Sequence, residues 1–205
     1  MVRELLVATT NRGKFAEIRH HLAPLVPRIV PLWEIPSPPP IVESGETFRE
    51  NALIKARALV RLTRMPTLAD DSGLVVYALG GRPGVWSARY AGEGATDREN
   101  NEKLLREMAH LPDGSRGASF VCVITLVFPD GRELTAEGRV EGEILRAPRG
   151  EGGFGYDPLF FVRGTDRTMA ELPLEVKNRS SHRGIALDRL VEMLGNYCLQ
   201  DRSVS

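Results

Sequence analysis

The sequence is poor in cysteine, with 2 in 205 residues. Cys122 and Cys198 lie far apart and in no metal-ligand spacing, so neither a disulfide framework nor a cysteine-bound metal is expected. Cys122 lies within an apolar run and is expected to be a buried thiol. This cysteine usage is typical of a protein of the reducing cytoplasm.

The sequence also lacks an excess of either charge and any long apolar run. Lys plus Arg and Asp plus Glu are both 27, giving a net charge of zero, which disfavours a nonspecific nucleic-acid binder but permits a local basic pocket. The longest nearly apolar run, Ala118–Phe128, is shorter than the roughly 20 residues of a membrane span. The N-terminal apolar stretch is brief, so no signal peptide is expected. We expect a single globular domain over residues 1–205.

Four helices are predicted from start and stop signals. The first should follow the loop Thr9–Gly13, because apolar residues recur after it at helical spacing. Capping boxes at Thr47–Glu50 and Thr96–Glu99 begin two more, which should end near residues 64 and 109. Ser181 is expected to cap the last helix, which should end near Gly195.

Strands are predicted between these helices. The expected strand segments are residues 5–8, 28–32, 67–69, 74–79, 118–128 and 133–140. Asp70–Gly73 should separate the third segment from the fourth, and Pro129–Gly131 should form the turn of a hairpin between the last two. Helices interleaved with strands and one hairpin imply an α/β fold with a mixed sheet.

The loop Thr9-Thr10-Asn11-Arg12-Gly13-Lys14 has features of a phosphate site. It joins a strand to a helix, where backbone N–H groups and the helix dipole favour an anion. Gly13 permits close approach and Lys14 adds a positive charge. It is not a P-loop, because Ala8 and Phe15 stand where glycine and Ser or Thr are needed. An ordinary turn with a solvated lysine remains the alternative.

Acidic residues indicate a metal site. Asp70 and Asp71 follow an apolar strand, and neighbouring strand residues point to opposite faces, so only one should face the site. Glu43, just before the second helix, could supply a second oxygen ligand for Mg²⁺. Lys55 shares a helix face with Asn51 and could neutralise a triphosphate, although a surface lysine is the alternative.

A glycine-rich segment, Gly152–Pro158, carries two aromatic residues. A purine can stack on Phe154 or Tyr156, and Asp157 supplies an acceptor beside them. A hydrophobic turn packed on the core would show the same pattern. Ser181-His182-Arg183 offers donors at the start of the last helix, although a histidine there is more often a structural cap.

Together these segments resemble one family, the inosine/xanthosine triphosphate pyrophosphatases, in order and over almost the whole chain. The matching segments are Thr9–Lys14, Glu43–Ala52, Asp70–Leu74, Gly80–Gly84, Ser87–Tyr90, Gly152–Pro158 and Ser181–Arg183. The sequence departs from some relatives at Val42, where they carry another acid, so Glu43 alone represents that segment as a metal ligand.

The resemblance implies an elongated α/β fold with two lobes around a mixed, twisted central sheet and a cleft between the lobes. It also implies a homodimer and a requirement for Mg²⁺. Thr9–Lys14 would hold the triphosphate, Glu43 and Asp71 would bind the metal, and Asp71 would also accept a proton. The further residues that would contact substrate are Ser72, Phe154, Gly155, Tyr156, Asp157, Lys177, His182 and Arg183.

The expected activity is hydrolysis of dITP, ITP and XTP to the monophosphate and pyrophosphate, in the cytoplasm and without nucleic-acid or membrane partners. Arg183 or nearby N–H groups are candidate donors to the 6-oxo group that distinguishes these bases from adenine. A pyrophosphatase for another modified nucleotide is the closest alternative. A non-catalytic nucleotide-binding module is disfavoured because it would need no carboxylates at Glu43 and Asp71. An NAD(P)-dependent enzyme lacks support, since no G-x-G-x-x-G follows the first strand.

Overall fold

The computed structural model describes residues 2–200, except for the side chains at positions 174, 178, 179 and 196–200. The expectation for Cys198 therefore lies outside the described residues. The strands are β1 Glu4–Val7, β2 Arg28–Pro31, β3 Thr67–Val76, β4 Gly117–Val127, β5 Glu133–Ile144 and β6 Phe160–Val162. The α-helices are α1 Arg12–Leu22, α2 Phe48–Thr63, α3 Asp97–Glu107, α4 Leu174–Ser180 and α5 His182–Gln200.

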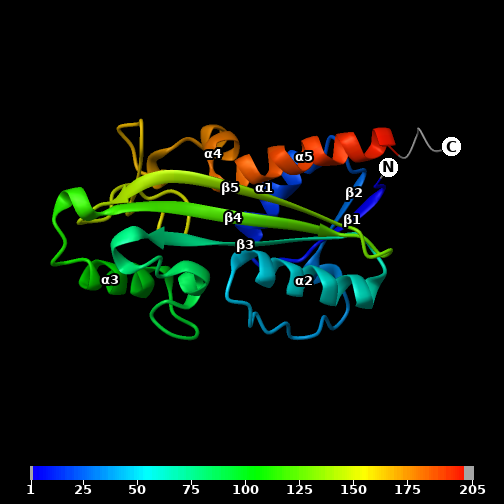
Figure 1. Ribbon diagram of the computed structural model, residues 1–205, viewed down its shortest axis with the longest axis horizontal. Helices are drawn as coiled ribbons and strands as arrows, with labels where there is room; N and C mark the ends of the chain where they lie inside the picture. The colour runs from blue at the N-terminus through cyan, green and yellow to red at the C-terminus, as the bar shows by residue number, and fades with distance from the viewer. Residues whose placement is uncertain (1, 201–205) are drawn as a thin grey trace. The chain divides into compact units, whose positions relative to one another are not determined.

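The strands form one mixed sheet in the order β2-β1-β3-β4-β5-β6. β1 runs parallel to both β2 and β3, whereas β5 and β6 are antiparallel. The expected α/β fold with a mixed sheet is therefore confirmed (Figure 1).

Both predicted capping boxes are present. The Thr47 side chain accepts from the Glu50 N–H while the Glu50 carboxylate accepts from the Thr47 N–H, and Thr96 and Glu99 repeat the arrangement at α3. These reciprocal bonds satisfy N–H groups that a helix start leaves without partners.

Several elements differ from expectation: the strand expected to end at residue 79 ends at Val76, and the one expected to end at residue 140 continues to Ile144. β3 continues unbroken through residues 70–73, so the prediction of an interruption there was wrong. The polar residues Asp70 and Asp71 are compatible with a strand because side chains from three helices compensate their charges, as shown below. The last helix extends past Gly195 to Gln200, and α4, which carries no clear sequence signal, precedes it.

The described chain divides into two compact units. Unit 1 comprises residues 2–71, 122–138 and 183–200, and unit 2 comprises Ser72–Val121 and Arg139–His182. β3, β4 and β5 each contribute residues to both units. The single domain expected for residues 1–205 stays a prediction.

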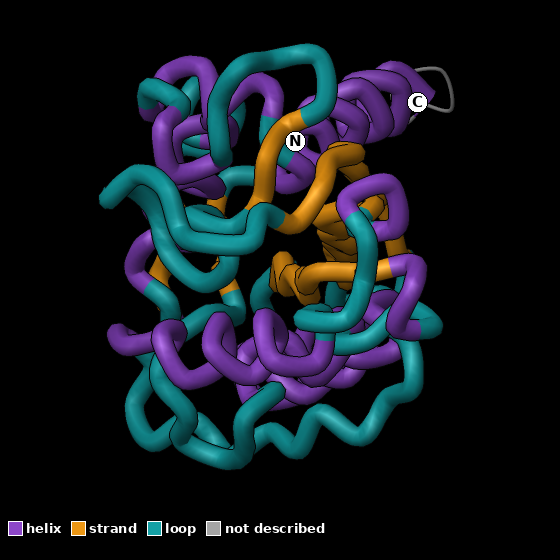
Figure 2. The backbone as a smooth tube through the Cα atoms, turned by 90° about the vertical axis from the view of Figure 1, so that its left-hand side faces the viewer, coloured by secondary structure: helices purple, strands orange, loops and turns teal. Residues whose placement is uncertain are grey.

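The core of unit 1 has two layers, one on each face of its strands. Leu5 and Val7 of β1 pack in a cluster with buried residues of α1 and α5, whereas Leu6 packs in a second cluster with buried residues of α2. The period-two alternation of a strand explains this division. Figure 1 shows α1 and α5 on one face of these strands and α2 on the other, and Figure 2 shows helices on both sides of the strands.

The core of unit 2 lies between α3 and its strands. Leu104 of α3 and Met108, which directly follows this helix, are fully buried and cluster with Leu74 of β3 and Phe120 of β4. No helix within residues 2–200 is sufficiently long and apolar to cross a membrane.

A buried arginine joins the elements of unit 2. Arg116 is 4% exposed, and its guanidinium donates to the carbonyls of Ile144, Met108 and Leu145 at 2.7, 2.9 and 3.1 Å. Burial lowers the pKa of Arg116 from its ordinary value. Each of the three guanidinium nitrogens nevertheless donates to a carbonyl, so Arg116 links the end of α3 to β5 and the residue after it.

We expect Arg116→Ala to lower the free energy of unfolding by about 3 kcal/mol, because three carbonyls lose their donor. Urea unfolding followed by circular dichroism measures the change. Arg146→Ala is the matched control, since the exposed Arg146 pairs with exposed Asp113 at 2.7 Å and donates to the Leu111 carbonyl at 3.0 Å. Both contacts are at the surface, where water replaces them at little cost. Equal effects of the two substitutions would contradict a special role for Arg116.

Candidate functional site

Two adjacent carboxylates on β3 have different partners. Asp70 pairs with Lys14 of α1 and Arg183 of α5, whereas Asp71 contacts Asn51 and Lys55 of α2. Successive strand residues point to opposite faces of a sheet, which explains why each aspartate meets a different helix layer. The expectation that the two side chains diverge is thereby confirmed.

Asp71 and Glu43 approach the same lysine. The Lys55 Nζ lies 3.2 Å from Glu43 Oε2 and 3.7 Å from Asp71 Oδ1. Lys55 is thus part of an acidic cluster, and the alternative of a solvated surface lysine is excluded by its side-chain exposure of 12%. Two carboxylates from separate segments therefore converge on one cationic group.

Asn51 holds the two acidic segments together. It is 1% exposed; its Nδ2 donates to Asp71 Oδ2 at 3.2 Å, and its Oδ1 accepts from the Gly45 N–H at 2.8 Å. A Cβ at Gly45 would stand 2.6 Å from the Glu50 Cβ, so only glycine permits this approach to α2. The loop that carries Glu43 is fixed to the start of α2 in this way.

Burial raises the pKa of Asp71, while Lys55 and Lys14 act in the opposite direction and Glu43 adds to the rise; the net shift is upward. A carboxylate with a raised pKa is a better proton acceptor than an ordinary aspartate when it is ionised.

Asp70 belongs to a buried network of charges. Lys14 Nζ lies 2.9 Å and Arg183 Nη2 3.3 Å from Asp70 Oδ2, and Arg183 Nη1 donates to Glu17 Oε2 at 2.5 Å. Burial alone would raise the pKa of Asp70, but Lys14, Arg183 and Lys55 hold it below its ordinary value. Asp70 is therefore an ionised partner of two cations.

The segment Thr9–Lys14 joins β1 to α1, as predicted, and its phosphate-binding role stays a prediction. The Asn11 side chain caps α1 by accepting from the Lys14 N–H at 3.0 Å, and Thr9 Oγ1 accepts from the Asn11 N–H at 3.2 Å. Thr10, Arg12 and Gly13 are exposed. The Arg12 guanidinium lies 4.9 Å from the centroid of the Trp33 ring.

Arg183 is buried at the start of α5, the helix position expected from the sequence. Its exposed fraction is 1%, and its guanidinium pairs with Glu17 and Asp70 within unit 1. These contacts fit a residue that positions Asp70 and Lys14 better than one that donates to a 6-oxo group. The predicted direct contact with the base stays a prediction.

The aromatic loop, defined here as Gly152–Pro158, is part of unit 2 and is built around Asp157. The Asp157 carboxylate is 3.1 Å from the Phe154 N–H that donates to it, and Lys177 of α4 also donates to it. The Lys177 Nζ lies 5.2 Å from the centroid of the Phe154 ring. The resemblance gave Lys177 a role without a local reason, and the structure supplies one: this ammonium anchors the loop.

Gly153 permits the compact form of the aromatic loop. Its φ is +81°, and a Cβ there would stand 2.1 Å from Asp157 Oδ2 and 2.6 Å from Lys177 Nζ. Any side chain would therefore displace the buried ion pair.

The remaining predicted residues of unit 2 are partly or wholly buried. The His182 ring stacks on Phe120 with centroids 4.9 Å apart and an interplanar angle of 15°. The Tyr156 hydroxyl donates to the Ser87 carbonyl at 2.9 Å, and burial raises its pKa. Ser72 follows Asp71 in β3 and is half-buried.

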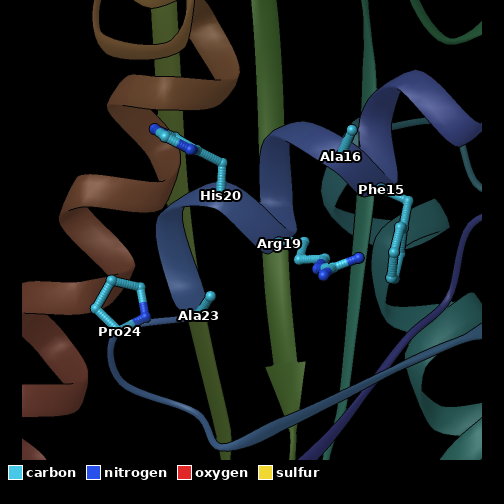
Figure 3. Close-up of a pocket in the computed structure, with 6 residues that line it drawn as sticks. All are labelled: Phe15, Ala16, Arg19, His20, Ala23 and Pro24. Atoms are coloured by element: carbon cyan, nitrogen blue, oxygen red, sulfur yellow. The ribbon is translucent and has the colours of Figure 1, made fainter.

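A surface pocket of about 660 Å³ runs along α1 but does not contain this chemistry (Figure 3). Its lining residues are Phe15, Ala16, Arg19, His20, Ala23 and Pro24. None of them is acidic, whereas Lys14 and Glu17 of the same helix are directed to Asp70 and Arg183.

Sequence reasoning did not assign Asn51 or Glu17 to the site. Asn51 could have been found, since it lies one helical step before Lys55 and the two share a face of α2. Glu17 gives no such signal, because its partner Arg183 is 166 residues away in the chain.

Fold and site together define an α/β protein with an acidic, lysine-containing cluster at β3 and α2. The Ham1 family model matches residues 5–193, so the chain belongs to the Ham1 family, as the sequence resemblance indicated.

Its relatives include pyrophosphatases. A dITP/XTP pyrophosphatase of Geobacter sulfurreducens is 53% identical over 93% of this chain and 96% of its own. A dITP/XTP pyrophosphatase of Thermus thermophilus is 54% identical over 92% of this chain and 90% of its own. The structure of a HAM1 protein from Coxiella burnetii matches with a TM-score of 0.87 and 46% identity, covering 96% of this chain and 100% of that one.

We expect Asp70→Asn to lower the free energy of unfolding by about 3 kcal/mol, because Lys14 and Arg183 lose the charge that balances them in a buried place. Thermal and urea unfolding measure this loss. Asp130→Asn is the control; its carboxylate lies on the surface beside Arg132, and the substitution should leave stability almost unchanged. Wild-type stability in Asp70→Asn would show that the network does not depend on the charge.

Proposed function

We propose that this protein hydrolyses non-standard purine nucleoside triphosphates, namely dITP, ITP and XTP, to the nucleoside monophosphate and pyrophosphate. The observation that carries the proposal is the convergence of Glu43 and Asp71 on Lys55. This arrangement gives one place both a carboxylate base and a positive charge. The names of the Geobacter and Thermus relatives support the choice of substrate.

The donor set fits a bound Mg²⁺. Glu43 and Asp71 are hard oxygen donors that already converge on a cation, and Mg²⁺ binds proteins through one or two carboxylates while substrate phosphates and water fill its shell. When bound, Mg²⁺ supplies positive charge to the phosphate oxygens.

In the proposed mechanism Asp71 acts as the base. Its carboxylate takes a proton from a water molecule as the water oxygen forms a bond to the α-phosphorus. The bond from that phosphorus to the bridging oxygen breaks, and pyrophosphate departs with that oxygen. Lys55 and Lys14 are the chain's own cations for the charge that develops, and Asn51 keeps the Asp71 carboxylate in place.

Four further residues follow from the same proposal. The half-buried Phe154 ring is the surface proposed to stack on a purine, and Tyr156, His182 and Ser72 are proposed to line the substrate around it. The Tyr156 ring is 4% exposed and packs in the core of unit 2, so stacking depends on Phe154. Hypoxanthine and xanthine carry a 6-oxo acceptor and an N1–H donor, the reverse of the adenine pattern, so donors matched to them would be left unpaired by ATP. We also propose that the protein works in the cytoplasm as a homodimer.

A product assay on ITP, dITP, XTP, ATP and GTP, with and without Mg²⁺, tests the activity. We expect rapid Mg²⁺-dependent release of pyrophosphate and monophosphate from the first three and slow release from ATP. In ¹⁸O-water the label should enter the monophosphate. Faster turnover of modified pyrimidine triphosphates would assign the protein to another substrate class, and label in pyrophosphate would place the attack at the β-phosphorus.

We expect Asp71→Asn to reduce kcat for ITP by about 10²–10⁴-fold, the usual contribution of a general base. Binding of ITP, measured by calorimetry, should persist because the substitution keeps the side-chain volume. Near wild-type turnover in this variant would remove Asp71 from the mechanism.

Glu43→Gln should raise the Mg²⁺ concentration needed for half-maximal activity by about tenfold or more, because one anionic ligand is lost. Glu46→Gln is the matched control, since Glu46 lies in the same loop and is exposed. The two variants are compared in Mg²⁺ titrations of ITP hydrolysis. An unchanged Mg²⁺ dependence in Glu43→Gln would exclude Glu43 as a ligand.

A further inference from the structure

The start of α3 is attached to the aromatic loop through one residue, Gly155. The Gly155 N–H donates to Asp97 Oδ2 at 2.6 Å, and the Gly155 carbonyl accepts from Asn101 Nδ2 at 2.9 Å. Asp97 and Asn101 are four residues apart and therefore share one face of the helix. Both backbone polar groups of a single glycine are thus held by the same helix face.

The hydrogen bond from the Gly155 N–H to Asp97 is strong because its acceptor is a carboxylate. Asp97 is the first residue of α3, directly after the N-cap Thr96, and a carboxylate that accepts from a backbone N–H forms a charge-assisted bond. Gly155 itself has a φ of +62°, a left-handed conformation that costs glycine little. The bonds from α3 therefore hold this residue in a backbone conformation that only glycine adopts readily.

Gly155 lies between the two side chains proposed to meet the base. Phe154 is held at its N–H by Asp157, and the Tyr156 hydroxyl is held by the Ser87 carbonyl. Ser87 is itself fixed, because its Oγ donates to the Gly84 carbonyl at 2.6 Å. Hydrogen bonds thus restrain each residue from 154 to 157, and the two bonds at Gly155 come from α3.

A third side chain at the start of α3, that of Asn100, holds another loop of unit 2. Asn100, which is 3% exposed, accepts from the Ala91 N–H at 2.8 Å and donates to the Ala88 carbonyl at 3.2 Å. Its neighbours Asp97 and Asn101 reach the aromatic loop instead. One turn of helix thus fixes two separate loops of unit 2.

We propose that Asp97 and Asn101 are positioning residues that fix Gly155 and thereby set the affinity of the Phe154–Asp157 loop for a purine base. This inference rests on the proposed function, since it concerns the base end of that substrate. Neither residue touches the nucleotide; both act through the peptide groups on either side of the Gly155 α-carbon. Loss of either bond lets the loop open, and base affinity falls while the phosphate end is unaffected.

The first measurement does not require activity. Hydrogen exchange of peptides that span residues 150–158 is compared in wild type, Asp97→Ala, Asn101→Ala and Glu102→Gln, without nucleotide. The two alanine variants should exchange faster in this segment and keep wild-type exchange in β4. Glu102→Gln is the control, because Glu102 pairs with Arg98 on the exposed part of the same helix and should exchange as wild type does. Unchanged exchange in both alanine variants overturns the proposal.

The second measurement separates the base end from the phosphate end. Calorimetry with IMP should show the dissociation constant raised about tenfold in Asp97→Ala and Asn101→Ala, the size expected for one lost hydrogen bond. The dissociation constant for inorganic pyrophosphate should not change. Asp97→Asn keeps an acceptor for the Gly155 N–H and should restore most of the IMP affinity. Equal losses for IMP and pyrophosphate, or unchanged IMP affinity, overturn the proposal.

Kinetics on ITP complete the test. We expect KM to rise about tenfold in the alanine variants while kcat changes less than threefold, since the proposed proton acceptor, Asp71, is untouched. Failure of the proposed function is recognised separately, because wild type itself would then not hydrolyse ITP. In that case IMP binding and hydrogen exchange still decide the role of Asp97 and Asn101.

Discussion

The alternation of side chains along β3 is the constraint on which the chemistry of unit 1 depends. Because Asp70 and Asp71 are adjacent, they must point to opposite faces of the sheet. Each face is covered by a different helix layer, so one carboxylate meets Lys14 and Arg183 and the other meets Lys55. A shift of register by one residue would exchange these environments and with them the roles of the two acids.

The two environments give the acids opposite tendencies. Asp70 is surrounded by cations that keep it ionised, and it is a fixed countercharge for Lys14 and Arg183. Asp71 has fewer opposing cations relative to its burial and shares Lys55 with Glu43, so its pKa rises. Two identical side chains thereby become a structural ion-pair partner and a proposed base, which is how proteins separate such roles in neighbouring carboxylates.

In unit 2 the aromatic loop is held mainly by hydrogen bonds to its backbone, whereas the site in unit 1 is held by paired charges. Lys177 and Asp157 close the loop on one side, and the bonds from α3 to Gly155 close it on the other. A loop rich in glycine would lose much conformational entropy on binding a planar base. Anchors that already restrict the loop reduce that loss and would favour the proposed stacking on Phe154.

The sequence by itself determined the local features. The helix starts at Thr47 and Thr96, the strand-loop-helix at Thr9–Lys14 and the hairpin after Phe128 all follow from short-range chemistry, and the ordered motifs were sufficient to indicate the family. The tertiary structure decided the partnerships: Arg183 with Glu17, Asn51 with Asp71 and α3 with Gly155. It also decided that β3 continues through its aspartates. The physical reason is range, since caps and turns depend on residues within a few positions, whereas the compensation of a buried charge depends on side chains that only the folded chain brings within hydrogen-bond distance.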